Sequence, residues 1–292
     1  MIYTMKLRTC LRPFVLQIQP RRCLKVFPLP LAVVLAVGPL AAQIPNDSAA
    51  RDPHAVQPER PTVATHAGTV ARGWIELEEG AEWDRFDDRS KGFLAPTNLK
   101  IGLAPRAQLN LLVNLVRDRF DGAPFLLGDV TIGVKYRIVD DDRILGDFAV
   151  LPAVKFPTGA DGAGTGTTDF SLLFISSRQL GPVAFDLNVG QTRRTGDGTE
   201  VPKIASIWTA SFGFPVTGPL GGVFEIFGYP HTSGPVGNKA TAAVLVGPTL
   251  MVREWLSLDA GIIAPLTGPQ PRALYAGFVW NFGCVLPRRM CH

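Results

Sequence analysis

The ten residues from Asp129 to Ile138, DVTIGVKYRI, carry the pattern that decides the fold. Apolar side chains stand at every second position of this stretch, and polar or small residues stand between them. Successive side chains of a β-strand point to opposite faces of the sheet, so the stretch has one apolar face and one polar face. The pattern predicts a strand whose apolar face contacts lipid or a protein core.

The same alternation returns along most of the chain. It is clear in Ala107–Val116 and in Val183–Gly190. Ile75–Trp83 follows it except at Glu79, which falls on the apolar side and is expected to mark a strand end or a bulge. Clusters of Gly, Pro, Asp and Asn separate such segments, as they do between strands. The pattern predicts about twelve strands, near residues 70–86, 92–104, 107–118, 128–139, 145–157, 168–178, 182–193, 203–216, 220–230, 239–253, 256–265 and 272–283.

The lengths of the connections indicate how these strands are arranged. Bacterial membrane barrels have an even number of antiparallel strands and alternate short periplasmic turns with longer external loops. Short connections are expected near residues 105, 140–143, 180–182, 217–219 and 254, and long, polar, Gly-rich ones at 117–128, 158–167, 192–202 and 231–238. We therefore predict an all-β fold, a transmembrane antiparallel up-and-down β-barrel over residues 69–283, in the outer membrane of a Gram-negative bacterium with its N-terminus in the periplasm.

Two other fold classes are less compatible with the sequence. A membrane-spanning helix needs about twenty apolar residues, and the longest uncharged stretch after the leader, Ile204–Phe224, contains two prolines and several glycines. A soluble β-sandwich or small barrel would show the same alternation, but its inward side would be filled with large apolar side chains. Here the polar faces hold Gly, Ser, Thr, Asn and charged residues, as a hydrated lumen allows.

The first 42 residues have the features of a secretory signal peptide. Six of the 29 basic residues of the chain precede Val26, an apolar stretch follows, and small residues stand at Ala41 and Ala42. An N-terminal membrane anchor is the alternative, but the apolar run is short and contains prolines. Without the leader, 23 basic residues remain against 25 acidic ones, so the pI of 9.0 belongs to the leader and nucleic acid is not an expected partner.

Two segments flank the predicted barrel. Residues 43–68 are rich in Pro, Ala and charged residues without a period, and they predict a disordered periplasmic lead-in. Residues 284–292 form a C-terminal tail that contains Cys284 and Cys291. In an oxidising periplasm these two cysteines could form a small disulfide loop or stay free, and the sequence leaves both open.

A family resemblance rests on the leader, the strand count and the motif KFPTG, Lys155–Gly159, which ends a strand before a Gly-, Asp- and Thr-rich loop. The last strand also ends aromatic at Phe282, as closing strands of outer-membrane proteins do, although ten residues follow it. The chain resembles the outer-membrane family labelled as transporters of the meta-cleavage pathway of phenol degradation. The resemblance implies a barrel that passes small compounds, aromatic ones among them, across the outer membrane.

The side chains on the predicted inward face are the candidate lumen-lining residues. They carry both signs of charge and could line an aqueous path, or pair across a narrow lumen and close it. They are Glu76, Glu78, Glu82, Lys135, Arg137, Lys155, Asp169, Asp186, Glu225 and Asp259. Six aromatic residues are expected at the lipid interfaces instead, namely Trp83, Tyr136, Phe156, Trp208, Phe214 and Trp280.

The sequence contains no motif that indicates catalysis, a metal or a cofactor. Of the four histidines, only His231 falls on the predicted barrel, in an external loop, where a lone imidazole is usually just solvated. The leading hypothesis is a channel for small molecules, with aromatic or hydrophobic compounds as candidates, and its other partners are outer-membrane lipids and the barrel-assembly machinery. The alternatives are a closed, non-transporting barrel whose external loops bind a ligand or a partner and, third, a lipid-acting barrel enzyme.

Overall fold

The computed structural model of the chain describes residues 52–86, 89–118, 123–197, 202–231, 240–268 and 270–285. These residues form β-strands, turns and irregular segments; among them, no helix is long and apolar enough to cross a membrane. The strands are β1 (Trp74–Arg85), β2 (Lys91–Ala104), β3 (Ala107–Asp118), β4 (Leu126–Leu127), β5 (Val130–Asp142), β6 (Gly146–Phe156), β7 (Asp169–Leu180), β8 (Val183–Arg194), β9 (Ile204–Thr217), β10 (Leu220–Tyr229), β11 (Thr241–Arg253), β12 (Leu256–Thr267) and β13 (Arg272–Cys284).

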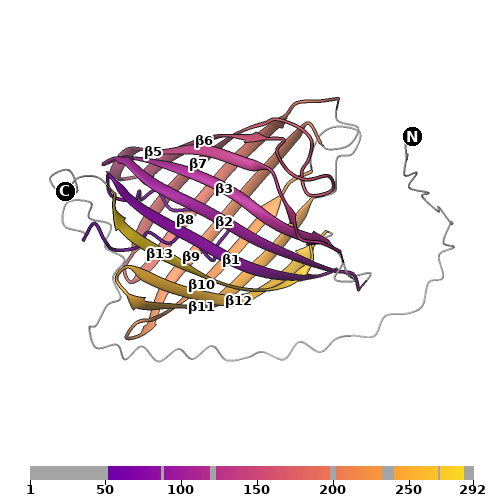
Figure 1. Cartoon of the computed structure of the whole chain (residues 1–292). Helices are drawn as coiled ribbons and strands as arrows, with labels where there is room; N and C mark the ends of the chain where they lie inside the picture. The colour runs from indigo at the N-terminus through magenta and orange to yellow at the C-terminus, as the bar shows by residue number, and fades with distance from the viewer. Residues whose placement is uncertain are drawn as a thin grey trace, which may run out of the picture. The chain divides into compact units, whose positions relative to one another are not determined.

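Twelve long antiparallel strands close into a barrel (Figure 1). Each pairs with its neighbours in the chain, and β1 pairs with both β2 and β13, so no long strand has a free edge. Closure satisfies the backbone hydrogen bonds without help from solvent, which a lipid environment requires. The predicted twelve-stranded up-and-down barrel is confirmed, with each observed strand within a few residues of its predicted position.

Two details of the strand prediction were wrong. The two-residue strand β4 lies inside the stretch expected to be an external loop and pairs with the end of β3. Glu79 does not mark a strand end or a bulge, because β1 continues through it to Arg85. Its carboxylate accepts a hydrogen bond from the Thr97 hydroxyl of β2 at 2.6 Å. The irregularity of this strand lies instead between Ile75 and Glu76.

Short and long connections alternate between the two ends of the barrel. The turns at 105–106, 143–145, 181–182, 218–219 and 254–255 share one end, called here the short-turn end. The connections at 86–90, 119–129, 157–168, 195–203, 230–240 and 268–271 share the other, called here the long-loop end. This division follows the predicted pattern of turns and loops.

The two faces of the barrel wall differ as the alternation predicts. In β5, Ile132, Val134 and Tyr136 are exposed on the outside, whereas Lys135 and Arg137, which alternate with them, are buried on the inside. Of the six predicted interface aromatics, five are more than a third exposed and Trp208 is half-buried. The outer surface therefore presents apolar side chains, and the polar side chains face the lumen.

The segment before β1 differs from its prediction. Residues 52–73, called here the strap, lie inside the barrel and are held by side chains of the wall (Figure 1, indigo). The prediction of a disordered lead-in over 43–68 is therefore wrong for residues 52–68. The strap lacks a period because most of its hydrogen-bond partners are lumen side chains, and its pairing with a strand is limited to one isolated bridge between Arg72 and Gly102 of β2.

Parts of the predicted domain organisation lie outside the described residues. These are the signal peptide at 1–42, residues 43–51 of the lead-in and the tail from residue 286 onward. Cys284, at the end of β13, is disulfide-bonded, so of the two states left open for this residue the structure has the oxidised one.

Candidate functional site

The strap enters the lumen from the short-turn end. His54 lies near the turn between β11 and β12, where its ring stacks on Trp255 with 6.2 Å between centroids. The backbone N–H of Val56 donates to the carbonyl of Glu254 in the same turn at 2.8 Å. Asn281 of β13 donates its side-chain amide to the carbonyl of Pro53 at 3.3 Å. These contacts fix the outer part of the strap against the rim.

The apex of the strap lies near the middle of the barrel wall. The carboxylate of Glu225, central in β10, accepts hydrogen bonds from the N–H groups of Val63 and Ala64 at 2.8 and 2.7 Å. Asn188 of β8 holds Thr65 from both sides, since it accepts from the backbone N–H at 2.7 Å and donates to the carbonyl at 2.9 Å. Irregular backbone at membrane depth is tolerated where protein groups satisfy it in this way.

Beyond the apex, the strap returns to the short-turn end and leads into β1. The N–H of Ala67 donates to the Ser177 hydroxyl of β7 at 2.8 Å, and that of Val70 donates to Gln108 of β3 at 2.8 Å. The strap is thus a U-shaped segment that reaches about halfway into the lumen. Side chains from nine of the twelve long strands bond to it, namely Glu76 and Glu78, Lys100, Gln108, Lys135, Ser177, Asn188, Glu225, Asp259 and Asn281.

A buried ion network joins the strap to one side of the wall. Lys100 of β2 has its ammonium 2.6 Å from Glu76 and 2.8 Å from Glu78, both on β1, and the three side chains are almost fully buried. The two glutamates also accept N–H groups of the strap. Lys135 of β5 pairs with Glu59 of the strap itself. Removing one member of such a buried network leaves an uncompensated charge, which is costly.

Arg60 binds the wall where two glycines face each other. Its guanidinium pairs with the Asp259 carboxylate at 3.1 Å and lies directly over Gly80 and Gly277, which are cross-strand partners in β1 and β13. A Cβ atom at either glycine would collide with the guanidinium. The close approach of Arg60 therefore requires glycine at both positions.

Apolar contacts complete the seating of the strap. Val63 packs against a cluster formed by Val223, Phe227, Leu245, Ile263 and Tyr275, among others. Ala67 belongs to a second cluster with Ala149 and Ile175. Both of these apolar clusters lie on the inward face of the described wall, and each contacts the strap.

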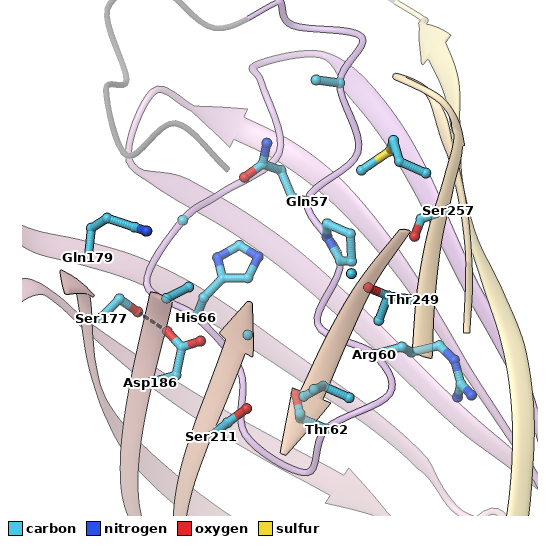
Figure 2. Close-up of a pocket in the computed structure, with 18 of the residues that line it drawn as sticks. Gln57, Arg60, Thr62, His66, Ser177, Gln179, Asp186, Ser211, Thr249 and Ser257 are labelled. Carbon is cyan, nitrogen blue, oxygen red and sulfur yellow. Dashed lines mark hydrogen bonds between the residues drawn. The ribbon is translucent and has the colours of Figure 1, made fainter. Parts of the chain in front are cut away.

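A cavity of about 550 Å³ remains beside the strap (Figure 2). Prolines of three short turns, Pro105, Pro182 and Pro219, line its outer part, so it opens at the short-turn end. Its polar lining is contributed by both the strap and the wall, with Gln57, Arg60, Thr62, His66, Ser177, Asp186, Ser211, Thr249 and Ser257 among the residues. This volume is in the range of small-molecule binding cavities.

A separate polar cluster folds the long loop at 157–168 onto the wall. Asp129 accepts hydrogen bonds from the backbone N–H groups of Gly159 and Thr165, both at 2.9 Å, and pairs with Lys155 at 2.6 Å. Burial alone would raise the pKa of the Asp129 carboxyl, but these hydrogen bonds outweigh it and hold the pKa below its ordinary value. Two residues of the KFPTG motif, Lys155 and Gly159, thus serve to close this loop.

The ten candidate lumen residues divide into three groups by their partners. Glu76, Glu78, Lys135, Glu225 and Asp259 bind the strap. Lys155 and Asp169 pair with each other at 3.3 Å near the long-loop end. Three remain: Glu82 is half-buried on β1, while Arg137 and Asp186 line the cavity, and Asp186 accepts a hydrogen bond from Ser177.

Several functional residues were missed by the sequence reasoning. Lys100, Gln108, Asn110, Asn188 and Asn281 are almost fully buried on the inward face. Their positions on polar faces of predicted strands were a usable signal, because they alternate with apolar residues. Glu59 and Arg60 could not be found in this way. They lie in a segment without a period, and no local sequence feature indicates that such a segment lies inside the lumen.

The three histidines of the described ranges lie at separate places, with His54 at the rim, His66 in the cavity and His231 in a long loop. His231 is exposed. His66, expected in the lead-in, instead lies in the cavity near Asp186 and Ser177, but the Ser177 hydroxyl donates to Asp186 rather than to an imidazole (Figure 2). In the described ranges, no group of three His, Cys, Asp or Glu residues is placed to hold a metal ion.

Comparison with known families places these features in context. A sequence model described as "Putative MetA-pathway of phenol degradation" matches residues 59–282, which covers most of the strap and the twelve long strands except the last two residues of β13. The chain belongs to this family. Family membership confirms the resemblance found in the sequence. No curated protein matches the chain significantly.

Among solved structures, this family member is similar to the COG4313 outer membrane channel from Pseudomonas putida F1. The identity is 13%, the match covers 76% of this chain and 100% of that one, and the TM-score is 0.60. A KdgM porin in complex with disordered oligogalacturonate matches at 9% identity over 71% of this chain and 99% of that one, with a TM-score of 0.48. At these identities the first match shows a shared outer-membrane barrel fold.

Proposed function

We propose that the protein is an outer-membrane channel for small molecules and that the strap sets the width of its lumen. The observation that carries this proposal is the cavity of about 550 Å³ between the strap and the wall, which opens at the short-turn end. A barrel with only a structural interior would be expected to fill such a volume with side chains. The short-turn end faces the periplasm in this proposal, as in other bacterial barrels.

The contacts of the strap support the proposal that it narrows the lumen and can be displaced. It is bound by side-chain hydrogen bonds, two ion-paired groups, small apolar contacts and a few backbone hydrogen bonds at the rim, such as that from Val56 to Glu254. In the described residues its strand pairing is one isolated bridge, Arg72 with Gly102, and not a ladder. Interactions of this kind are individually worth about 1 kcal/mol, or somewhat more where charged groups take part. Binding of a ligand could therefore displace part of the strap from the wall without unfolding the barrel.

Small aromatic or apolar compounds are the proposed solutes of the channel. The family description names phenol degradation. Val223 gives such a compound an apolar contact in the cavity, and Phe227, Leu245 and Tyr275, which the strap covers, become available to it when the strap is displaced. Neither a cofactor nor covalent chemistry has a part in this function. The second candidate is a closed barrel that does not transport, which the bonding of the strap to nine strands favours.

The test is solute uptake by liposomes that contain the refolded protein without its leader. We expect uptake of small aromatic solutes by the intact protein, and a larger size limit after deletion of residues 52–70. If only the deletion variant takes up solute, the strap closes the barrel and the second candidate is correct. If neither takes up solute, the channel proposal is wrong.

A further inference from the structure

The outer surface of the barrel has a groove of about 640 Å³ at the long-loop end, over β1, β12 and β13. Its floor is apolar and is made by Trp83, Ile262, Ala264 and Leu274. Leu274 is 60% exposed and Ile262 is 47% exposed, so the floor is open to the surroundings. The proposed channel path lies on the opposite face of the wall, so this groove needs a separate explanation.

Three cations stand in a row along one edge of this groove. Arg85 of β1 is directly opposite Lys91 of β2 on one side and Arg272 of β13 on the other. All three are exposed. Cross-strand partners point to the same face, and neighbouring strands are about 4.8 Å apart, so the three charges lie close together on the outside.

The next row toward the barrel centre is apolar on the same face. This apolar row lies two positions along each strand from the three cations. In it, Trp83 is opposite Phe93 of β2 and Leu274 of β13, and Leu274 is opposite Ile262 of β12. The rings of Trp83 and Phe93 pack edge to face, with 5.7 Å between centroids. The surface therefore changes from cationic to apolar within one step of the strand pleat.

The cationic row lacks a neutralising partner in the described part of the chain. None of its three residues has a carboxylate within ion-pair distance there. Asp84 borders the groove, but it alternates with Trp83 and Arg85 and so belongs to the inward face. Like charges directly opposite each other destabilise a sheet, so the arrangement favours binding of an external anion.

We propose that this groove binds a membrane lipid with a phosphorylated headgroup, such as the bisphosphorylated glycolipid of the outer leaflet. The phosphates bind Arg85, Lys91 and Arg272, and the acyl chains lie along Trp83, Phe93, Leu274 and Ile262. Charge and apolar contact are then satisfied together, as in other basic lipid sites. The inference rests on the proposed outer-membrane location, with the long loops outside, and is independent of what passes through the lumen.

Native mass spectrometry of the refolded protein with lipid A tests the proposal. One basic residue near a lipid surface contributes a factor of about five in affinity. We therefore expect the variant R85Q/K91Q/R272Q, which lacks three such residues, to bind lipid A about a hundredfold more weakly than the unmodified protein. The matched control R143Q/R193Q/R253Q removes three exposed cations elsewhere, Arg193 at the long-loop end of β8 and the others at the short-turn end. Its affinity should stay within about twofold.

Two further probes separate lipid recognition from charge alone. Phosphatidylethanolamine has acyl chains but no net charge, and pyrophosphate has the charge but no chains, so both should bind much more weakly than lipid A. Equal binding of either probe, or lipid A binding unchanged in the triple variant, would overturn the proposal. If the triple variant does not refold, R85Q and K91Q are measured singly. Solute uptake should be unaffected in all of them, which keeps this test distinct from that of the channel.

Discussion

The carboxylate of Glu225 accepts the backbone N–H of Ala64 at 2.7 Å, halfway along the lumen. A wall residue thus binds the main chain of a segment about 160 positions earlier, so no side chain of the strap is needed for this contact. The same carboxylate accepts the N–H of Val63. This side chain fixes the turn of the strap together with Asn188, which holds Thr65, and removal of Glu225 tests whether the strap limits passage.

Glu225→Ala should widen the channel. The change leaves two buried N–H groups without acceptors, at about 1 to 3 kcal/mol each, so the apex should detach from β10. We expect larger single-channel conductance in planar bilayers. Glu225→Gln, which keeps one acceptor oxygen, should have an intermediate effect. Asp161→Asn, in an exposed loop, serves as the control, and equal conductance in Glu225→Ala and this control would show that the apex does not limit flow.

Lys100→Met should strongly destabilise the barrel. Glu76 and Glu78 would lose their shared cation in a buried site, and breaking a buried ion pair from one side costs about 3 to 5 kcal/mol. Urea unfolding in detergent, followed by tryptophan fluorescence, measures the loss. The triple variant K100M/E76Q/E78Q removes all three charges and should regain part of the stability. A triple variant less stable than Lys100→Met would contradict this account of the network.

Gly277→Ala should displace Arg60 from Asp259. The added methyl group would occupy the space of the guanidinium, so the ion pair must shift or break. We expect a loss of thermal stability and altered conductance. Gly213→Ala is the matched control, because Gly213 also lies on an inward position and a Cβ atom there would meet only Ala184 at 3.8 Å. Similar effects of both substitutions would rule out a specific role for Gly277.

Asp129 should keep the loop at 157–168 protected from proteases over a wide pH range. Its folded pKa lies below the ordinary 3.8, so its stabilising contribution is complete above that value and is lost only as the pH falls through the lowered pKa. Asp129→Asn should expose the loop to proteinase K at neutral pH, measured by mass spectrometry of the cleavage sites. Asp161→Asn should not. Loop cleavage that increased already between pH 7 and pH 5 in the unmodified protein would contradict the sign of this shift.

The strands of the barrel could be predicted from the sequence, but the strap inside the lumen could not. Strand β3 was placed without error because one of its faces is apolar at every position from Leu109 to Leu115, and the period of two depends only on neighbours along the chain. The strap depends on pairings such as Thr65 with Asn188, which are 123 positions apart. Its Pro-, Ala- and Thr-rich composition is also that of a disordered segment, so composition could not separate the two cases.

A reversible lock on the strap would test directly whether it moves during transport. Ala67 and Ser177 are hydrogen-bonded neighbours on the strap and on β7, so the double variant A67C/S177C should form a disulfide under oxidising conditions. If transport requires displacement of the strap, the covalent lock should reduce solute uptake to that of liposomes without protein, because the open state becomes inaccessible. Reduction should restore uptake. The unmodified protein with and without reductant controls for the disulfide at Cys284, and each single cysteine variant controls for the substitutions. Equal uptake in the locked and reduced forms would mean that solutes pass beside a stationary strap, through the existing cavity.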